Sequence, residues 1–295
     1  MVHHRPPAVT GPASATDAGQ GLTIRRGRRV PEDPEVSVCI LVLDDADLAV
    51  RCLDALRRHA PEATTEVVVV ANGTAPDQQA RLIAGDDAVL VTSPVNLGFG
   101  AGCNCAARVA RGRFLVFLND DSMVEPGCVD ALVRAAEAVP GVGAVGGFDP
   151  QFFPAYFEDV DLCLALAAHG FRVRYEPEAR VVHLGSQSTT VPYRRFLLAR
   201  NRQRLIERWS DALEQFEPRP GKESGPDYEA SLERAVRRAD APAAARGVTA
   251  ASAGRTGGHS FGTADATDAA DALREEYLAH LERTEAENHR RIREL

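Results

Sequence analysis

Two short acidic clusters are the part of this chain whose residue types and spacing best suit chemistry. The first, Asn-Asp-Asp at 119–121, directly follows the apolar run 114–118, and the second, Glu-Asp-Val-Asp at 158–161, directly precedes the apolar run 162–168. Carboxylates at the end of a buried strand are unfavourable unless something pairs with them, and oxygen ligands suit Mg²⁺ or Mn²⁺. A metal at the first cluster and a general base in the second would suit group transfer from a phosphorylated donor. The alternative is that both clusters are solvated, because Asp and Glu are favoured in loops and in the first turn of helices.

The composition argues against several classes of protein. The 295 residues include 42 acidic and 34 basic side chains, for a net charge of −8, which argues against a nucleic-acid-binding protein. No apolar stretch approaches the roughly 18 residues of a membrane-spanning helix, and the N-terminus lacks the apolar core of a secretory signal. The six cysteines lie mostly in apolar segments, which predicts reduced, buried thiols in a cytoplasmic protein.

Strands and helices are predicted to alternate along the chain from residue 36. Apolar strands are expected at 36–43, 66–71, 88–92, 113–118 and 142–145, with helices between them. Strands that are apolar throughout are typical of a mostly parallel α/β sheet with helices on both faces. Ligands bind at the carboxyl ends of such strands, where Asn72, Asn96 and the first acidic cluster fall.

The domain organisation follows from the same pattern. Residues 1–35, with an arginine cluster at 25–29, are expected to form a disordered tail, and residues 36–209 a single domain. Within that domain, two short strands are expected at 171–175 and 180–184, followed by a basic amphipathic helix over 193–209. Residues 210–272 are expected to be a low-complexity linker. Residues 273–295 are predicted to form a charged helix or a solvated, fraying tail.

Six segments, taken together and in order, resemble the inverting family 2 glycosyltransferases of the GT-A fold. They are VSVCILVL (36–43), EVVVVANGT (66–74), NLGFGAGCNCAA (96–107), GRFLVFLNDDSMVEPG (112–127), GFDPQFFPAYFEDVDLCLALAAHGFRV (147–173) and ARVVHLGSQST (179–189). The resemblance covers residues 36–209, and within the family it is nearest to bacterial rhamnosyl and related sugar transferases that build surface polysaccharides.

The resemblance implies a donor, a metal and an acceptor. The donor would be a nucleoside diphosphate sugar, whose diphosphate is neutralised by a divalent Mn²⁺ or Mg²⁺ ion as it leaves. In the family's Asp-x-Asp motif, which matches 119–121 here, Asp121 is the implied metal ligand, and His183 after the last strand is a second. A lone histidine at a strand end is also commonly structural. The acceptor would be a saccharide or a lipid-linked sugar.

The resemblance also implies catalytic and donor-binding residues. The family's base lies in an acidic pair before a helix, which matches Glu158 and Asp159, with Asp159 as the residue that deprotonates the acceptor hydroxyl. The implied donor-binding residues are Asn72, Asn96, Gly98, Asn119 and Asp120. Three arginines of the late helix could face the diphosphate or form a solvated basic face; they are Arg195, Arg200 and Arg202.

Two departures from the family pattern bear on activity. Ala71 stands where the family usually has an Asp that grips the nucleoside. The family also separates the segments that meet here at 146/147 by several dozen residues, which carry central strands and part of the acceptor pocket. The alternatives to an active transferase are therefore an impaired descendant that serves as a nucleotide-binding or scaffold protein, and an unrelated doubly wound binding protein. For the transferase we expect a cytoplasmic location or peripheral association with the inner face of the plasma membrane.

Overall fold

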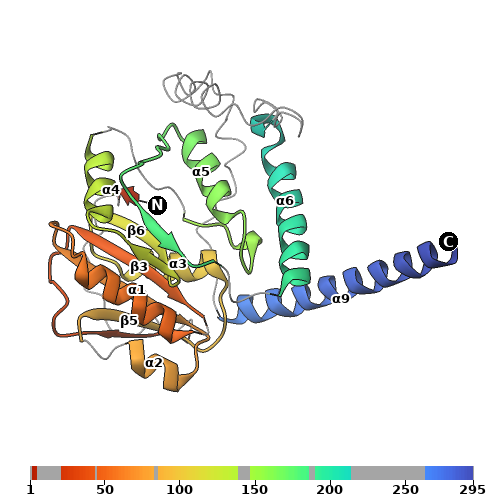
Figure 1. Ribbon diagram of the computed structural model, residues 1–295, viewed down its shortest axis with the longest axis horizontal. Coiled ribbons are helices and arrows are strands. Elements are labelled where there is room, and N and C mark those ends of the chain that lie inside the picture. Colours follow the sequence, from red (N-terminus) through yellow and green to blue (C-terminus); the bar gives the residue numbers. More distant parts are fainter. Residues whose placement is uncertain are drawn as a thin grey trace.

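A six-stranded sheet with strand order β1-β6-β3-β4-β5-β2 forms the frame of the computed structural model (Figure 1). The structure describes residues 2–4, 21–43, 45–82, 86–138, 147–185, 190–213 and 263–294. The central strands run parallel; they are β6 (Phe114–Asn119), β3 (Val36–Val42), β4 (Thr65–Asn72) and β5 (Ala88–Ser93). The outer strands pair antiparallel with β6 and β5; they are β1 (Val2–His4) and β2 (Thr23–Arg26).

Helices cover both faces of the sheet, as the strand pattern predicts. One face carries α1 (Ala46–Arg58) and α4 (Cys128–Glu137), with the short α2 (Pro76–Leu82) beside α1, and the other face carries α3 (Phe99–Val109). Because successive strand residues point to opposite faces, alternate residues of β3 enter the two separate cores. The predicted α/β fold class is confirmed.

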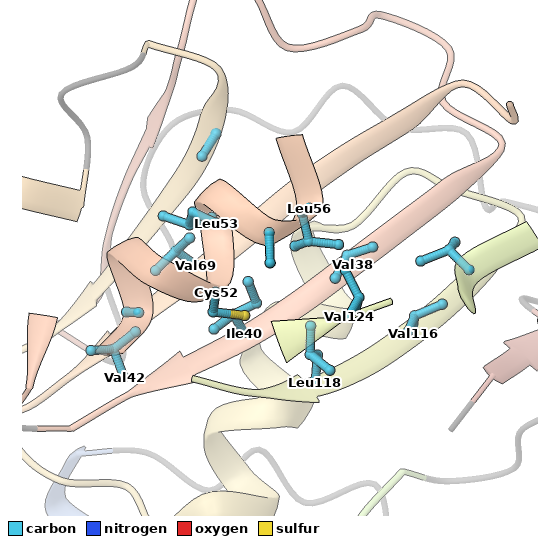
Figure 2. Packing of buried hydrophobic residues seen from close by; sticks show 14 of the residues in the cluster. Val38, Ile40, Val42, Cys52, Leu53, Leu56, Val69, Val116, Leu118 and Val124 are labelled. Atoms are coloured by element: carbon cyan, nitrogen blue, oxygen red, sulfur yellow. The ribbon is translucent and has the colours of Figure 1, made fainter. Parts of the chain in front are cut away.

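The core beneath α1 holds the sheet to its helices. Cys52, Leu53 and Leu56 of α1 point toward Val38 and Ile40 of β3, and all five side chains are buried (Figure 2). The helix begins at a carboxylate cap, because the side chain of Asp45 accepts hydrogen bonds from the backbone N–H groups of residues 47 and 48. This packing fixes the carboxyl ends of β3 and β6 relative to each other.

A second group of elements stands above the carboxyl edge of the sheet. The strands β7 (Ser122–Val124) and β8 (Val181–His183) pair antiparallel. The helical segments of this group are η1 (Pro150–Phe152), α5 (Glu158–Ala168), α6 (Val191–Leu213) and the long α9 (Thr263–Glu294). The N-terminal half of α9 lies beside α6, while its C-terminal half extends away from the sheet (Figure 1).

Part of the expected N-terminal tail is an ordered sheet edge. Arg26, in β2, reaches the buried Glu66 at the start of β4, with Nη1 2.7 Å from Oε2. Glu66 also accepts hydrogen bonds from the Ser37 hydroxyl at 2.7 Å and the Arg111 backbone N–H at 2.5 Å. The prediction of disorder for residues 21–35 is therefore wrong, because this segment supplies the cation that a fully buried carboxylate needs.

The other sequence-based boundaries need correction as well. Residues 171–175 form no strand: residues 172–175 are all exposed, and β8 pairs with β7 instead. The helix α6 continues to Leu213, and α9 begins at Thr263 inside the expected linker. Leu273 of α9 is buried, so this part of the helix is not a solvated tail. The predicted strand at 142–145, the rest of the linker (214–262) and the residues just before the 146/147 junction lie outside the described residues.

The contact between Arg26 and Glu66 gives a test of this edge. We expect Arg26→Ala to lower the free energy of unfolding by about 1–3 kcal/mol, because a buried carboxylate loses its cation. The matched control is Arg25→Ala, since Arg25 is exposed and lies 4.0 Å from the exposed Asp86, a pair that contributes little. Urea-induced unfolding measures both changes, and equal effects of the two substitutions would contradict the assignment.

Candidate functional site

A cleft of about 1440 Å³ opens at the carboxyl edge of the sheet. Its floor comes from the ends of β4 and β6, and its walls come from the segment leading into α5, from α6 and from α9. Most of the predicted site residues line this one cleft; they are Asn72, Asn96, Asn119, Asp120, Asp121, Glu158, Asp159 and His183. The topology thus brings together two acidic clusters that begin 39 residues apart in sequence (119 and 158).

The pairing of β7 with β8 places His183 beside Asp121. Nε2 of His183 lies 2.9 Å from Oδ1 of the buried Asp121, but the two groups are not aligned for a hydrogen bond, so Oδ1 has no donor. The side-chain amide nitrogen of Asn119 lies 3.4 Å from the same histidine nitrogen, which makes Nε2 an acceptor when the amide donates to it. Two acceptors that face each other at this distance fit a cation between them.

Asp120 is the second carboxylate at the end of β6. Burial is the main cause that raises the pKa of its side chain to about 7, and repulsion from the neighbouring carboxylates of Asp121 and Asp45 contributes to the same increase. Like-charged groups so close together are unfavourable in the absence of a cation. The local charge of the cleft floor is therefore negative and suited to a positively charged ligand.

A side-chain clamp shapes the loop after β5. The buried Asn72 accepts a hydrogen bond from the Leu97 backbone N–H at 2.7 Å and donates to Asn96 Oδ1 at 3.0 Å. Asn96 Oδ1 in turn accepts from the Gly98 N–H at 2.8 Å. Gly98 has φ +77°, and a Cβ there would lie 2.7 Å from the Phe153 ring. Gly98 therefore positions the loop without lining the cleft, whereas the two asparagines do both.

The acidic pair at the start of α5 is divided between the protein interior and solvent. Glu158 is buried, its Oε2 has no hydrogen-bond partner, and burial followed by the repulsion of Asp159 raises its pKa to about 7. Asp159 is exposed, and its Oδ1 accepts a hydrogen bond from the Val160 backbone N–H at 2.8 Å. Glu158 thus holds its proton to a higher pH than an ordinary carboxyl group, while Asp159 is the accessible carboxylate of the pair.

Residues 37–197, more than half of the chain, match the family model described as "Glycosyl transferase family 2". The chain belongs to glycosyl transferase family 2. The matched range contains both acidic clusters, and with it the predicted GT-A-like fold class is confirmed. The rhamnosyl-like specificity stays a prediction.

Two curated relatives cover part of this family 2 chain. It is 30% identical over 108 residues to the Bacillus subtilis (strain 168) protein named "Putative glycosyltransferase EpsH". The aligned segment covers 36% of this chain and 31% of that protein. It is 37% identical over 117 residues to the "O-antigen biosynthesis protein RfbC" of Myxococcus xanthus, over 38% of this chain and 9% of that protein. The chain thus spans less than a third of the length of either relative.

One similar solved structure covers most of the family 2 chain. It is a mannosyltransferase, PcManGT from Pyrobaculum calidifontis, in complex with GDP-Man and Mn²⁺. The TM-score is 0.49 at 18% sequence identity, and the match covers 86% of each chain. In the part of the family 2 chain that the structure describes, no helix is long and apolar enough to cross a membrane.

Sequence reasoning missed the contacts that fix α5 to α6. Asp161 is fully buried and accepts a hydrogen bond from Trp209 Nε1 at 2.7 Å, while Arg208 lies between Asp161 and Asp149. Burial raises the pKa of Asp161 to about 6, against the opposing effects of Trp209 and Arg208. In the sequence Asp161 resembles an ordinary acid in the first turn of α5, so nothing there distinguished it from a solvated residue.

The three arginines that could face the diphosphate are not brought into the cleft. Arg195 and Arg202 are exposed on α6 and do not line it. Arg200 instead donates to the Phe153 carbonyl at 2.9 Å and pairs with Glu276 of α9. Their arrangement agrees with the solvated-face alternative for Arg195 and Arg202, and with a structural role for Arg200.

The raised pKa of Glu158 predicts a pH-dependent stability. Because its pKa rises from 4.5 to about 7 on folding, the folded state binds more protons, and the free energy of unfolding falls between about pH 4.5 and 7. Below this window the stabilisation is complete, and above it the loss is complete, on the order of 3 kcal/mol. We expect Glu158→Gln to remove this component, so urea unfolding between pH 4.5 and 8 should give a shallower decline. Identical slopes for the two proteins would contradict the assignment.

Proposed function

We propose that the protein transfers a sugar from a nucleoside diphosphate sugar to a hydroxyl acceptor, with inversion at the anomeric carbon. The observation that carries the proposal is the single cleft that holds carboxylates from the end of β6 on one side and from the start of α5 on the other. One set suits the charge of a diphosphate–metal pair, and the other suits removal of a proton. Membership of family 2 supports the same reaction class.

The residues at the end of β6 fit a divalent cation. Asp121 offers a buried oxygen without a donor, and His183 offers a nitrogen beside it. No group of three or more His, Cys, Asp or Glu side chains among the described residues could hold a metal alone. Mg²⁺ and Mn²⁺ sites often have few protein ligands and take the remainder from substrate phosphates and water. When bound, the metal would stabilise the negative charge of the departing diphosphate.

The residues of the chain have separate tasks in this reaction. We assign the clamp of Asn72 and Asn96 to shaping the donor side of the cleft, together with Asn119 and Asp120. Asp159 takes the proton of the acceptor hydroxyl while the acceptor oxygen bonds to the anomeric carbon and the bond to the diphosphate oxygen breaks. Oδ2 of Asp159 makes no hydrogen bond with any described residue, so it is available to accept that proton. When the neighbouring Glu158 is protonated, it adds no competing charge.

The biological setting that we propose is synthesis of a cell-surface polysaccharide or glycolipid. The name of the Myxococcus xanthus relative, an O-antigen biosynthesis protein, supports this setting. A rhamnosyl or hexosyl donor and a saccharide or lipid-linked acceptor belong to the same proposal, as does a location in the cytoplasm or at the inner face of the plasma membrane.

A second candidate function is donor binding without transfer. Ala71 supports it, because a methyl group stands at the end of β4 where the family usually has a carboxylate. The direct junction at 146/147 supports it further, since a misplacement of about 1 Å in a catalytic group reduces rates roughly a hundredfold. In this case the fold is retained as a nucleotide-binding or scaffold protein.

Asp159→Asn separates the two candidates. We expect the unsubstituted protein, with Mn²⁺ and a panel of UDP-, dTDP- and GDP-sugars, to release nucleoside diphosphate in the presence of a sugar acceptor. Asp159→Asn should lower that rate by roughly 10²–10⁴-fold, because the general base is lost. The matched control is Asp211→Asn, at an exposed position of α6. Donor binding without turnover in the unsubstituted protein and in both variants would select the second candidate. The absence of donor binding would reject both candidates.

A further inference from the structure

One wall of the cleft is built by α9, which lies outside the part of the chain that matches the family. The match ends at residue 197, whereas α9 begins at Thr263. The cleft-lining residues of α9 follow the helical repeat along one side of its N-terminal half. They are Thr267, Ala270, Asp271, Leu273, Arg274 and Tyr277. This chain therefore adds a surface to the candidate site that the family model does not include.

Apolar and aromatic contacts fix this wall in place. Leu273 is 3% exposed and packs with Phe153, Phe196 and Leu197. The ring of Tyr277 lies 4.9 Å from that of Tyr193 and 5.2 Å from that of Phe196, measured between centroids. Aromatic pairs of this kind stabilise the contact beyond the contribution of the buried area.

Ion pairs add to the same contact. Glu276 of α9 pairs with Arg200 and lies 3.6 Å from Arg204, both on α6. Because Arg200 also donates to the Phe153 carbonyl, α9 is connected through α6 to the segment that leads into α5. The wall from α9 is thus continuous with the side of the cleft that carries Asp159.

Polar groups on this wall are left for a ligand. Asp271 and Arg274 are exposed and line the cleft. Neither makes an ion pair or side-chain hydrogen bond with any described residue. Asp271, Arg274 and Tyr277 follow one another at intervals of three residues, so they lie in a row on one side of the helix. The row offers a hydrogen-bond acceptor, a donor and an aromatic ring, in that order. The row has no net charge, which does not suit an anionic diphosphate.

We propose that Asp271, Arg274 and Tyr277 form the subsite for a saccharide acceptor, with Tyr193 of α6 as a second aromatic surface. Sugar rings present apolar C–H faces that pack on aromatic rings, and hydroxyl groups that hydrogen-bond to carboxylate and guanidinium groups. The inference rests on the proposed transferase function, and it names the side of the reaction that α9 serves. The donor would bind at the floor of the cleft, which the sheet forms.

Saturation-transfer NMR on the full chain tests the subsite without requiring turnover. The probes are the methyl glycosides of glucose, mannose and rhamnose, with octyl glucoside as a comparison. We expect ring protons of at least one methyl glycoside to be saturated, and Arg274→Ala and Asp271→Asn to weaken its binding roughly ten- to hundredfold. The matched controls are Arg202→Ala and Asp268→Asn, which change exposed residues that do not line the cleft.

The outcomes separate the subsite from the reaction. Signals from the octyl chain alone, no signal from any methyl glycoside, or equal loss in the control variants would overturn the subsite. Steady-state kinetics with an active donor provide a second readout. Arg274→Ala should raise the KM for the acceptor. An increase confined to the KM for the donor would assign Arg274 to the diphosphate and overturn the proposal. A glycoside signal lost in Arg274→Ala, in a protein that binds no nucleotide sugar, would uphold the subsite while the transferase function fails.

Discussion

The withdrawal of three carboxylates from water at one edge of the sheet is the constraint on which the site depends. Asp121 and Glu158 are buried and Asp120 is half-buried, and burial is the main cause that raises the pKa of Asp120 and Glu158 to about 7. Such an arrangement is unfavourable for an empty protein and favourable for one that binds a cation or exchanges a proton. The same cluster that lowers the stability of the fold therefore suits it to a phosphorylated ligand.

The surrounding elements hold these groups in place against that repulsion. The core beneath α1 fixes the carboxyl ends of the strands, and the β7–β8 pair places His183 beside Asp121. On the other side, the buried contacts of Asp161 with Trp209 and Arg208 fix the start of α5. The part of the chain that matches family 2 thus supplies the floor of the cleft and both acidic clusters, while α9 adds a wall of its own.

Much of this arrangement could be predicted from local patterns. The apolar strands and intervening helices predicted the sheet, because alternation and period depend on neighbouring residues only. The family motifs predicted that both acidic clusters belong to one site, and both line the same cleft, whereas the roles of their residues stay predictions. The sequence could not predict that residues 23–26 form an edge strand. This strand is held by the ion pair of Arg26 with the buried Glu66, which lies 40 residues later in the chain. Nor could it predict the docking of α9, because the contacts of Leu273 and Tyr277 with α6 cross a long stretch of chain.

We propose that Asp121 and His183 hold a divalent cation together with a nucleoside diphosphate. Pulsed electron paramagnetic resonance of Mn²⁺ tests this most directly, because it detects a coordinated imidazole nitrogen. In the presence of the protein and a nucleoside diphosphate, we expect a nitrogen coupling that disappears in His183→Ala, and weaker Mn²⁺ binding in Asp121→Asn. Mn²⁺ binding that needs no nucleotide and shows no nitrogen coupling, or the same spectrum in the His183→Ala protein, would contradict it.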